Sequence, residues 1–305
     1  TEHLIDKGEG NHQIIRNKLS PISDLEKFMR KIVTQKISPK NLSSLVDDLN
    51  NIEQLNMYTQ EDKSLSSYLS SLVLIGTTDY FNINLYCRKI INEALYIFNI
   101  EECKQLSDIN SNDSISIINK GISPLIDEMS KKSMDGREKL EAICVYFSNL
   151  IQKYEKAPMK KTSTTTNIAS PSYIKIHETA RNNTSLIGTS RRVGLLKNAI
   201  GKNDKSTESN VIISYYSKFS DTKEEFTLNL SEVEYTTGSG SKSDMVVTSK
   251  EIRKIINDTE DSKIKLLRET QLLFTKYVTE LSKYESDLQK IIYYTTEMDI
   301  LQCKY

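Results

Sequence analysis

The sequence has few of the residues that interrupt helices or close tight turns: 10 Gly and 5 Pro in 305 residues, with no Trp. Ordinary α/β enzymes use glycines in their tight turns, so this composition fits them poorly. No apolar run approaches the roughly 20 residues needed to span a bilayer, and the first residues show no signal-peptide pattern. With 37% hydrophobic and 27% charged residues, the chain is predicted to be soluble, helix-rich and extended, with no membrane partner.

Cysteines are also sparse, and they lie far apart. The four positions form no C-x-x-C pair and no close His–Cys cluster: Cys87, Cys103, Cys144 and Cys303. Isolated cysteines of this kind are typical of proteins in a reducing compartment, where thiols stay free. We therefore expect an intracellular protein with buried thiols and no structural metal.

Recognisable catalytic motifs are missing. The string nearest to a phosphate-binding loop is Gly238–Ser243, but Ser241 stands where the second Gly is needed, so a flexible hairpin loop is the better interpretation. His177 is expected to be a solvent-facing strand residue, and the other histidines, His3 and His12, are distant in sequence. The acidic pair Asp47-Asp48 is interpreted as a solvated helix face. The chain is accordingly predicted not to be an enzyme and to hold no cofactor.

Helical periodicity is what the sequence has in abundance. Thr248–Leu301 runs 54 residues without Gly or Pro, and Thr248 and Glu251 form a possible capping box at its start. From Leu267 onward the residues spaced three and four apart form a heptad seam, which predicts contact with another long helix. The seam comprises Leu267, Thr270, Phe274, Tyr277, Leu281, Tyr284, Leu288, Ile291, Thr295 and Met298.

The N-terminal part predicts an antiparallel helical core over residues 1–122. Its helices are expected from Ser23, capped together with Glu26, from Ser38-Pro39, over 64–75 and over 79–98. An ascending helix is then expected over 123–157, starting at Ser123-Pro124. Gly136 is a plausible bend in it, and its second half is the natural partner of the seam. The descending helix would occupy 248–305.

The segment 158–247 has a different character. A Thr/Ser/Asn-rich linker precedes runs of β-branched and aromatic residues, which predict three to five antiparallel strands. Residues 160–205 hold nine Lys/Arg and two acids, for a net charge of +7, whereas residues 206–248 have a net charge of −4. The fold class is therefore mainly α with a β-rich insert at the end of two long antiparallel helices.

A binding signal lies in the basic half of this insert. Arginine offers forked donors that fit phosphate oxygens, and hydroxyl groups add neutral contacts. Adjacent arginines such as Arg191 and Arg192 point oppositely on a strand, but on a turn or at a helix start both could face DNA. The predicted phosphate-contacting residues are Lys175, Arg181, Thr189, Ser190, Arg191, Arg192, Lys197 and Lys202. Aromatic residues are not interleaved with them, so sequence-specific reading is not expected.

Three stretches resemble the MutS family of DNA mismatch-repair proteins. Leu19–Phe28 followed by Ile37–Leu42 is similar to a core segment, Ile117–Met129 to the segment that opens the rising lever, and Met245–Ile252 to the return from clamp to lever. Ile122 departs from the family pattern, which has an aromatic residue there. Beyond Ile200 the clamp is longer and matches poorly.

The resemblance implies a lever-and-clamp fragment from the middle of such a protein. It implies binding to double-stranded DNA and a homodimer in the full-length protein. It also implies that ATP and Mg belong to an ATPase domain outside these residues. Two alternatives stay open from the residues alone. One is a coiled-coil structural or protein-interaction module without DNA binding, and the other, with the least support, is a stand-alone helical enzyme.

Overall fold

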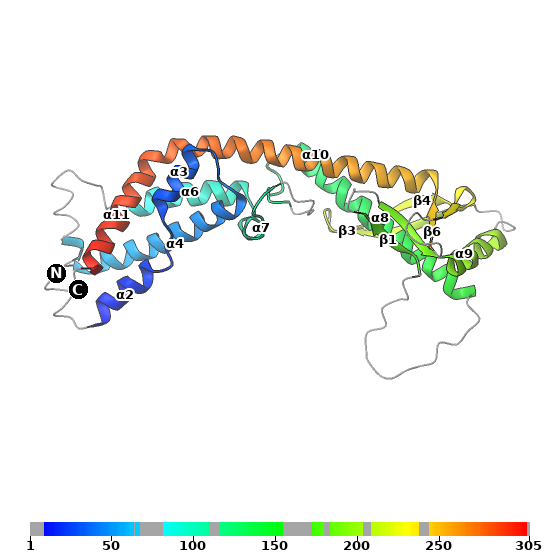
Figure 1. The fold of residues 1–305 in the computed structure, drawn as a ribbon, viewed down its shortest axis with the longest axis horizontal. Helices are drawn as coiled ribbons and strands as arrows, with labels where there is room; N and C mark the ends of the chain where they lie inside the picture. The colour runs from blue at the N-terminus through cyan, green and yellow to red at the C-terminus, as the bar shows by residue number, and fades with distance from the viewer. Residues whose placement is uncertain are drawn as a thin grey trace. The chain divides into compact units, whose positions relative to one another are not determined.

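The computed structural model describes residues 9–63, 65–67, 82–109, 116–154, 173–179, 184–203, 209–237 and 244–303. It confirms a mainly α chain with a β-rich insert (Figure 1). The chain divides into two compact units: unit 1 is Thr1–Ile126 with Leu267–Tyr305, and unit 2 is Asp127–Leu266. The finer division into four segments at residues 122, 157 and 247 stays a prediction.

Unit 1 is helical in its described residues. Its elements are α2 (Glu9–Leu19), α3 (Leu25–Val33), α4 (Pro39–Glu61), α6 (Ile83–Ile97), α7 (Ile100–Gln105), the end of α10 (Lys250–Glu280), the 3₁₀ segment η3 (Leu281–Tyr284) and α11 (Glu285–Cys303). Helices α4 and α6 run antiparallel, because Glu53 pairs with Arg88 while Asn56 bonds to Asn84. The expected helix at 64–75 lies mostly outside the described residues.

Two of the expected helix starts are displaced by one residue. The N-cap of α3 is Asp24, which accepts from the Lys27 N–H, whereas Ser23 donates to Asp48. The Asp48 side chain is buried in the structure, so its interpretation as part of a solvated helix face was wrong. Burial raises the pKa of Asp48, and the hydrogen bonds from Ser23 partly offset that rise. Ser38 caps α4 as predicted, in a capping box that uses the Asn41 side chain.

The N-cap of α10 is likewise Ser249 and not Thr248. The Ser249 Oγ accepts from the Ile252 N–H at 3.1 Å, while Thr248 ends strand β6 (Asp244–Thr248). Ser and Thr both occur as N-caps, with Ser preferred, and here Thr248 belongs to β6, so the cap falls on Ser249.

The seam of the C-terminal helix packs on the N-terminal helices. The Phe98 ring lies 5.5 Å from that of Phe274 and 4.8 Å from that of Tyr277, and the Tyr294 hydroxyl is 3.0 Å from Thr59 Oγ1. The expected pairing of the seam with helix 123–157 was therefore wrong. The helix is also interrupted by η3, where Lys283 and Tyr284 both bind Glu93 of α6.

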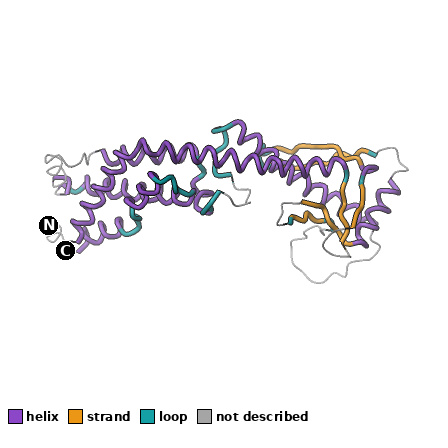
Figure 2. Tube along the Cα trace, turned by 45° about the horizontal axis from the view of Figure 1, so that its top comes forward, coloured by secondary structure: helices purple, strands orange, loops and turns teal. Residues whose placement is uncertain are grey.

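Unit 2 contains the six described strands, shown in orange in Figure 2. A four-stranded antiparallel sheet has the order β1-β2-β6-β5, and β3 and β4 form a separate hairpin. The bounds are α8 (Pro124–Tyr154), β1 (Lys175–Glu178), β2 (Thr184–Thr189), α9 (Ser190–Asn203), β3 (Asn210–Ser217), β4 (Thr222–Asn229), η2 (Leu230–Glu232), β5 (Glu234–Thr237) and β6. The prediction of three to five strands was too low, and helix α9 was not predicted.

One apolar core joins these elements of unit 2. It is formed by buried residues of α8, both sheets, α9 and the start of α10, among them Leu140, Phe147, Leu186, Leu196, Leu228, Val247 and Ile252. The hairpin is also anchored to α8 by polar groups, since Ser217 donates to Asp135 at 2.6 Å and the Lys218 N–H donates to Glu138 at 3.1 Å. Both carboxylates are buried, so these bonds fix where the hairpin sits.

Gly136 allows α8 and the first half of α10 to approach closely within unit 2. A Cβ built on Gly136 would overlap with the Oγ1 of Thr259, which itself donates to the Ile255 carbonyl at 2.6 Å. Leu140, one turn further along α8, lines the same small cavity as Ile256. Gly136 is therefore a contact point between two helices inside α8, which runs from Pro124 to Tyr154, and a bend there stays a prediction.

We expect Gly136→Ala to destabilise the protein by about 1–3 kcal/mol, because Thr259 cannot move away without losing its bond to Ile255. Gly194→Ala is the matched control: Gly194 is also in a helix, but a Cβ there meets nothing within 4 Å. That change should stabilise by roughly 0.5–1 kcal/mol. Urea unfolding midpoints test both, and equal shifts for the two variants would contradict the close-contact interpretation. Thr259→Ala should recover part of the loss in the Gly136→Ala background.

The three cysteines whose side chains the structure describes, Cys87, Cys103 and Cys144, should resist alkylation in the folded protein. Burial, with a nearby carboxylate in each case, raises the pKa of all three thiols to about 12. At pH 8 only about one thiol in ten thousand is then a thiolate, the reactive form. Iodoacetamide labelling mapped by mass spectrometry, with and without urea, checks this; rapid labelling of any of the three without urea would contradict it.

Candidate nucleic-acid interface

The predicted basic cluster lies where β2 passes directly into α9. Thr189 is the last residue of the strand and Ser190 the first of the helix, so Arg191 and Arg192 fall in the first helical turn. The first turn of a helix presents backbone N–H groups without intrahelical partners and carries the positive end of the helix dipole. These four residues therefore follow one another across the junction of β2 and α9, and the arginines lie at a helix start, one of the arrangements that the sequence left open.

The acidic residues that helices usually place at this end are absent from α9. Asp or Glu stands in the first turn of α3, α7, α8, α10 and α11, whereas the first turn of α9, like those of α4 and α6, has none. Two positive charges at the positive end of a helix dipole are unfavourable for helix stability. The first turn of α9 thus carries two arginines and no acidic side chain that would offset the positive end of the helix dipole.

The helical spacing of α9 separates a buried face from a basic face. Val193, Leu196, Ala199 and Ile200 are buried in the core of unit 2. Arg191 and Lys197 are exposed, and the exposed residues Gly194 and Gly201 add no side chain to this surface. The backbone of Lys202 belongs to α9, but its side chain is outside the described part of the structure, as is the whole of Arg181.

Arg192 differs from its neighbour because it is half-buried. Its guanidinium carbon lies 4.8 Å from the centroid of the Tyr173 ring, in cation–π geometry. Lys175, two residues after Tyr173, is exposed at the start of β1, where it pairs with Ile187 of β2. The structure thus places Lys175 on the strand adjacent to the one that leads into α9.

A comparison with family models matches residues 2–303 to MutS domain III. The chain belongs to this family. MutS domain III is the core and lever domain of MutS proteins, which act in DNA mismatch repair. It is non-catalytic, since the ATPase of these proteins is a separate domain. No curated protein was found to match the chain.

Many basic residues elsewhere in unit 2 of this MutS domain III are neutralised. Ion pairs to carboxylates are formed by Lys131, Lys132, Arg137, Lys218, Arg253 and Lys263. By contrast, Lys175, Arg192 and Lys197 form no ion pair with any residue that the structure describes. Their charges are therefore available to a ligand.

Sequence reasoning missed three basic residues on the first turns of α10. Lys250, Arg253 and Lys254 border an open groove with η2 and β5, in which Arg253 pairs with Glu234 at 2.5 Å. Their spacing of i, i+3 and i+4 is visible in the sequence. However, Glu232, Glu234 and Asp258 line the same groove and reduce its positive character.

The described residues hold none of the other sites that the sequence raised as candidates. His177 is exposed on β1, as predicted, and the string Gly238–Ser243 lies outside the described residues. Within the described ranges, no group of three or more His, Cys, Asp or Glu could hold a metal ion. No described helix is long and apolar enough to cross a membrane.

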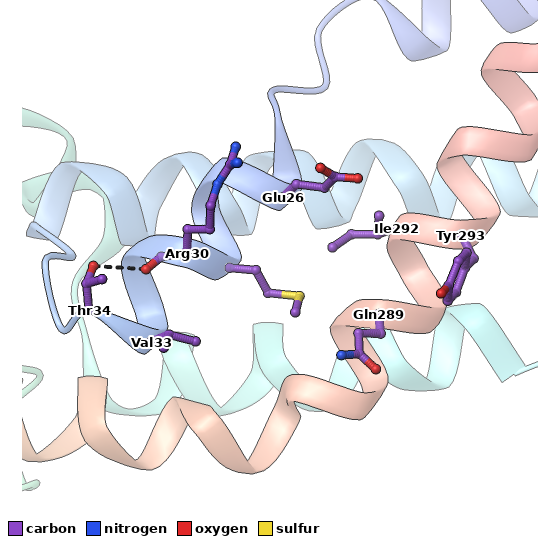
Figure 3. Close-up of a pocket in the computed structure, with 8 residues that line it drawn as sticks. Glu26, Arg30, Val33, Thr34, Gln289, Ile292 and Tyr293 are labelled. Carbon is purple, nitrogen blue, oxygen red and sulfur yellow. Dashed lines mark hydrogen bonds between the residues drawn. The ribbon is translucent and has the colours of Figure 1, made fainter.

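Unit 1 has a groove of a different kind, of about 580 Å³, between α3 and α11 (Figure 3). Figure 3 shows Val33 on α3 and Ile292 and Tyr293 on α11 around it, with Glu26 and Arg30 at its border. Its lining is mainly apolar and includes one cation, so it lacks the row of positive charges that a phosphate backbone requires.

Proposed function

We propose that unit 2 of this MutS domain III binds the sugar-phosphate backbone of duplex DNA without sequence specificity. The surface comprises Lys175, Thr189, Ser190, Arg191, Arg192 and Lys197, with Arg181 and Lys202 expected to extend it. The observation that carries the proposal is the start of α9, where two arginines stand at the positive end of a helix with no acidic residue in its first turn. An anion placed there interacts favourably with both arginines and with the helix dipole.

The absence of sequence specificity follows from what this surface presents. Base-edge reading needs a helix or strand inserted in a groove, and single-strand binding needs exposed aromatic faces for bases to stack on. The aromatic ring next to the arginines, Tyr173, is 6% exposed and its face is occupied by Arg192. Short hydroxyl residues and cations are suited instead to phosphate oxygens, which every sequence shares.

Three further elements of the proposal come from the family. We propose that the full-length protein is a homodimer that closes around DNA, and that an ATPase domain using ATP and Mg drives the closure. Helices α8 and α10 both contribute residues to the two units, so they are the two covalent routes by which the state of one unit could reach the other.

The proposal predicts that Arg191→Glu, Arg192→Glu and Lys197→Glu together abolish measurable duplex binding at moderate salt. Each lost phosphate contact lowers the log–log salt slope by about 0.9, so three contacts lower it by about 2–3. Fluorescence anisotropy with a labelled duplex, between about 50 and 200 mM salt, measures both quantities. Duplexes of equal length and unrelated sequence should bind the unmodified protein with equal affinity.

A matched control carries the same charge change on unit 1: Arg16→Glu, Arg30→Glu and Lys36→Glu, all exposed. That variant should keep the affinity and slope of the unmodified protein. If both triple variants bind duplex as the unmodified protein does, the contacts are assigned wrongly. If the unmodified protein shows no salt-dependent binding, unit 2 is better explained as a protein-interaction module.

A further inference from the structure

We infer that Tyr173 and Ser148 are positioning residues for the phosphate-binding surface, and that through them helix α8 controls the placement of Arg192. The inference rests on the proposed function, because it assigns a role within the same surface. It starts from two contacts that join α8 to the start of α9, one between Ser148 and the backbone at Tyr173 and one between Tyr173 and Arg192.

The contact between Arg192 and Tyr173 leaves the arginine able to bind an anion. A guanidinium group stacks through its flat face, while its N–H donors lie at its edge, in the plane of the group. Arg192 is half-buried, its guanidinium carbon is 4.8 Å from the Tyr173 ring centroid, and no described carboxylate pairs with it. Stacking restricts the rotamers of this long side chain before a ligand arrives, so less conformational entropy is lost on binding.

Tyr173 is itself fixed by α8. The backbone N–H groups of Tyr173 and Ile174 both donate to the Ser148 Oγ, at 3.1 and 3.3 Å. Ser148 is 4% exposed and lies in the last third of α8, so water does not compete for these bonds. The Ser148 hydroxyl group therefore fixes Tyr173 and Ile174, the two residues that directly precede β1, against α8.

Tyr173 and Ile174 are held on their other side by β2 and α9. A Cβ on Gly188 would lie 2.6 Å from Ile174 Cδ1, and 3.3 Å from both the Tyr173 carbonyl oxygen and Val193 Cγ2. The missing side chain at Gly188 thus lets the Tyr173–Ile174 segment pack tightly between β2 and the first turn of α9. A displacement of α8 at Ser148 would move Tyr173, and with it the support of Arg192.

The experiment compares duplex affinity and salt slope for full-chain variants at positions 173 and 192. Tyr173→Leu removes the ring and should weaken binding about threefold to tenfold, the range of a partly buried cation–π contact. Arg192→Gln should weaken binding at least as much, and each change should lower the salt slope by about 0.9. Tyr173→Phe keeps the ring and should retain the unmodified affinity and slope.

The double variant separates positioning from general support of the fold. If Tyr173 acts through Arg192, adding Tyr173→Leu to Arg192→Gln should cause no further loss of affinity. If it causes the same loss in both backgrounds, Tyr173 acts on the surface in another way and the inference is wrong. The inference is also wrong if Tyr173→Leu binds normally while the triple Glu variant does not. Normal binding by the triple Glu variant would instead contradict the proposed function.

A second pair of variants keeps the test decisive if Tyr173→Leu fails to fold, as judged by circular dichroism. Ser148→Ala removes the shared acceptor and should reduce affinity in the unmodified background but not in Arg192→Gln. Equal affinity losses in the two backgrounds, or no loss in either, would overturn the link from α8 to Arg192.

Discussion

The close contact of α8 with the first half of α10 is the constraint on which unit 2 depends. The chain leaves the end of α8 and returns at the start of α10, so everything between them is built on this helix pair. The contact is possible because Gly136 has no side chain to collide with Thr259. Residues of both helices, such as Phe147 and Ile252, then face the same core as the sheet and α9. The pairing of two helices thus decides where the β-rich insert can pack.

Polar anchoring then supplements apolar packing and gives the insert a defined orientation. Apolar contacts are non-directional, whereas a buried carboxylate must find donors in particular places. On α8, Asp135 accepts a hydrogen bond from the hydroxyl of Ser217, the last residue of β3, and Glu138 accepts one from the backbone N–H of Lys218. Ser148 does the same for the segment leading into β1. Helix α8 therefore carries three polar groups that orient the hairpin and the sheet, in addition to its apolar stripe.

Sequence patterns identified those features that depend on local spacing. The apolar stripe of α4, the cap at Ser38 and most of the seam, including Phe274 and Leu288, follow from one helix's own periodicity. Helix α9 also had such a stripe, in Val193, Leu196 and Ile200, but the sequence left this stretch open between a strand, a turn and a helix start. The helical spacing of these apolar residues was thus present in the sequence, but the surrounding segment is rich in β-branched residues and the spacing was not used.

Features that join distant segments could not be read in this way. The seam spacing shows that a partner exists but not which one, and the partner proved to be the N-terminal helices through Phe98 and Thr59. Gly136 is equally compatible with a bend and with a close helix contact until Thr259 is placed beside it. The stack of Arg192 on Tyr173 depends on how the two ends of the insert are brought together.

The start of α9 shows how a binding surface can oppose local stability. An arginine at the positive end of a helix is unfavourable by about 0.3–1 kcal/mol. The stack of Arg192 on Tyr173 offsets part of this cost, since a partly desolvated cation–π contact contributes a comparable amount. The net effect is a small loss of stability and a site whose charge is not neutralised by its own helix. Under the proposed function, a bound phosphate group would remove that remaining cost, so DNA binding and the local stability of α9 would be linked.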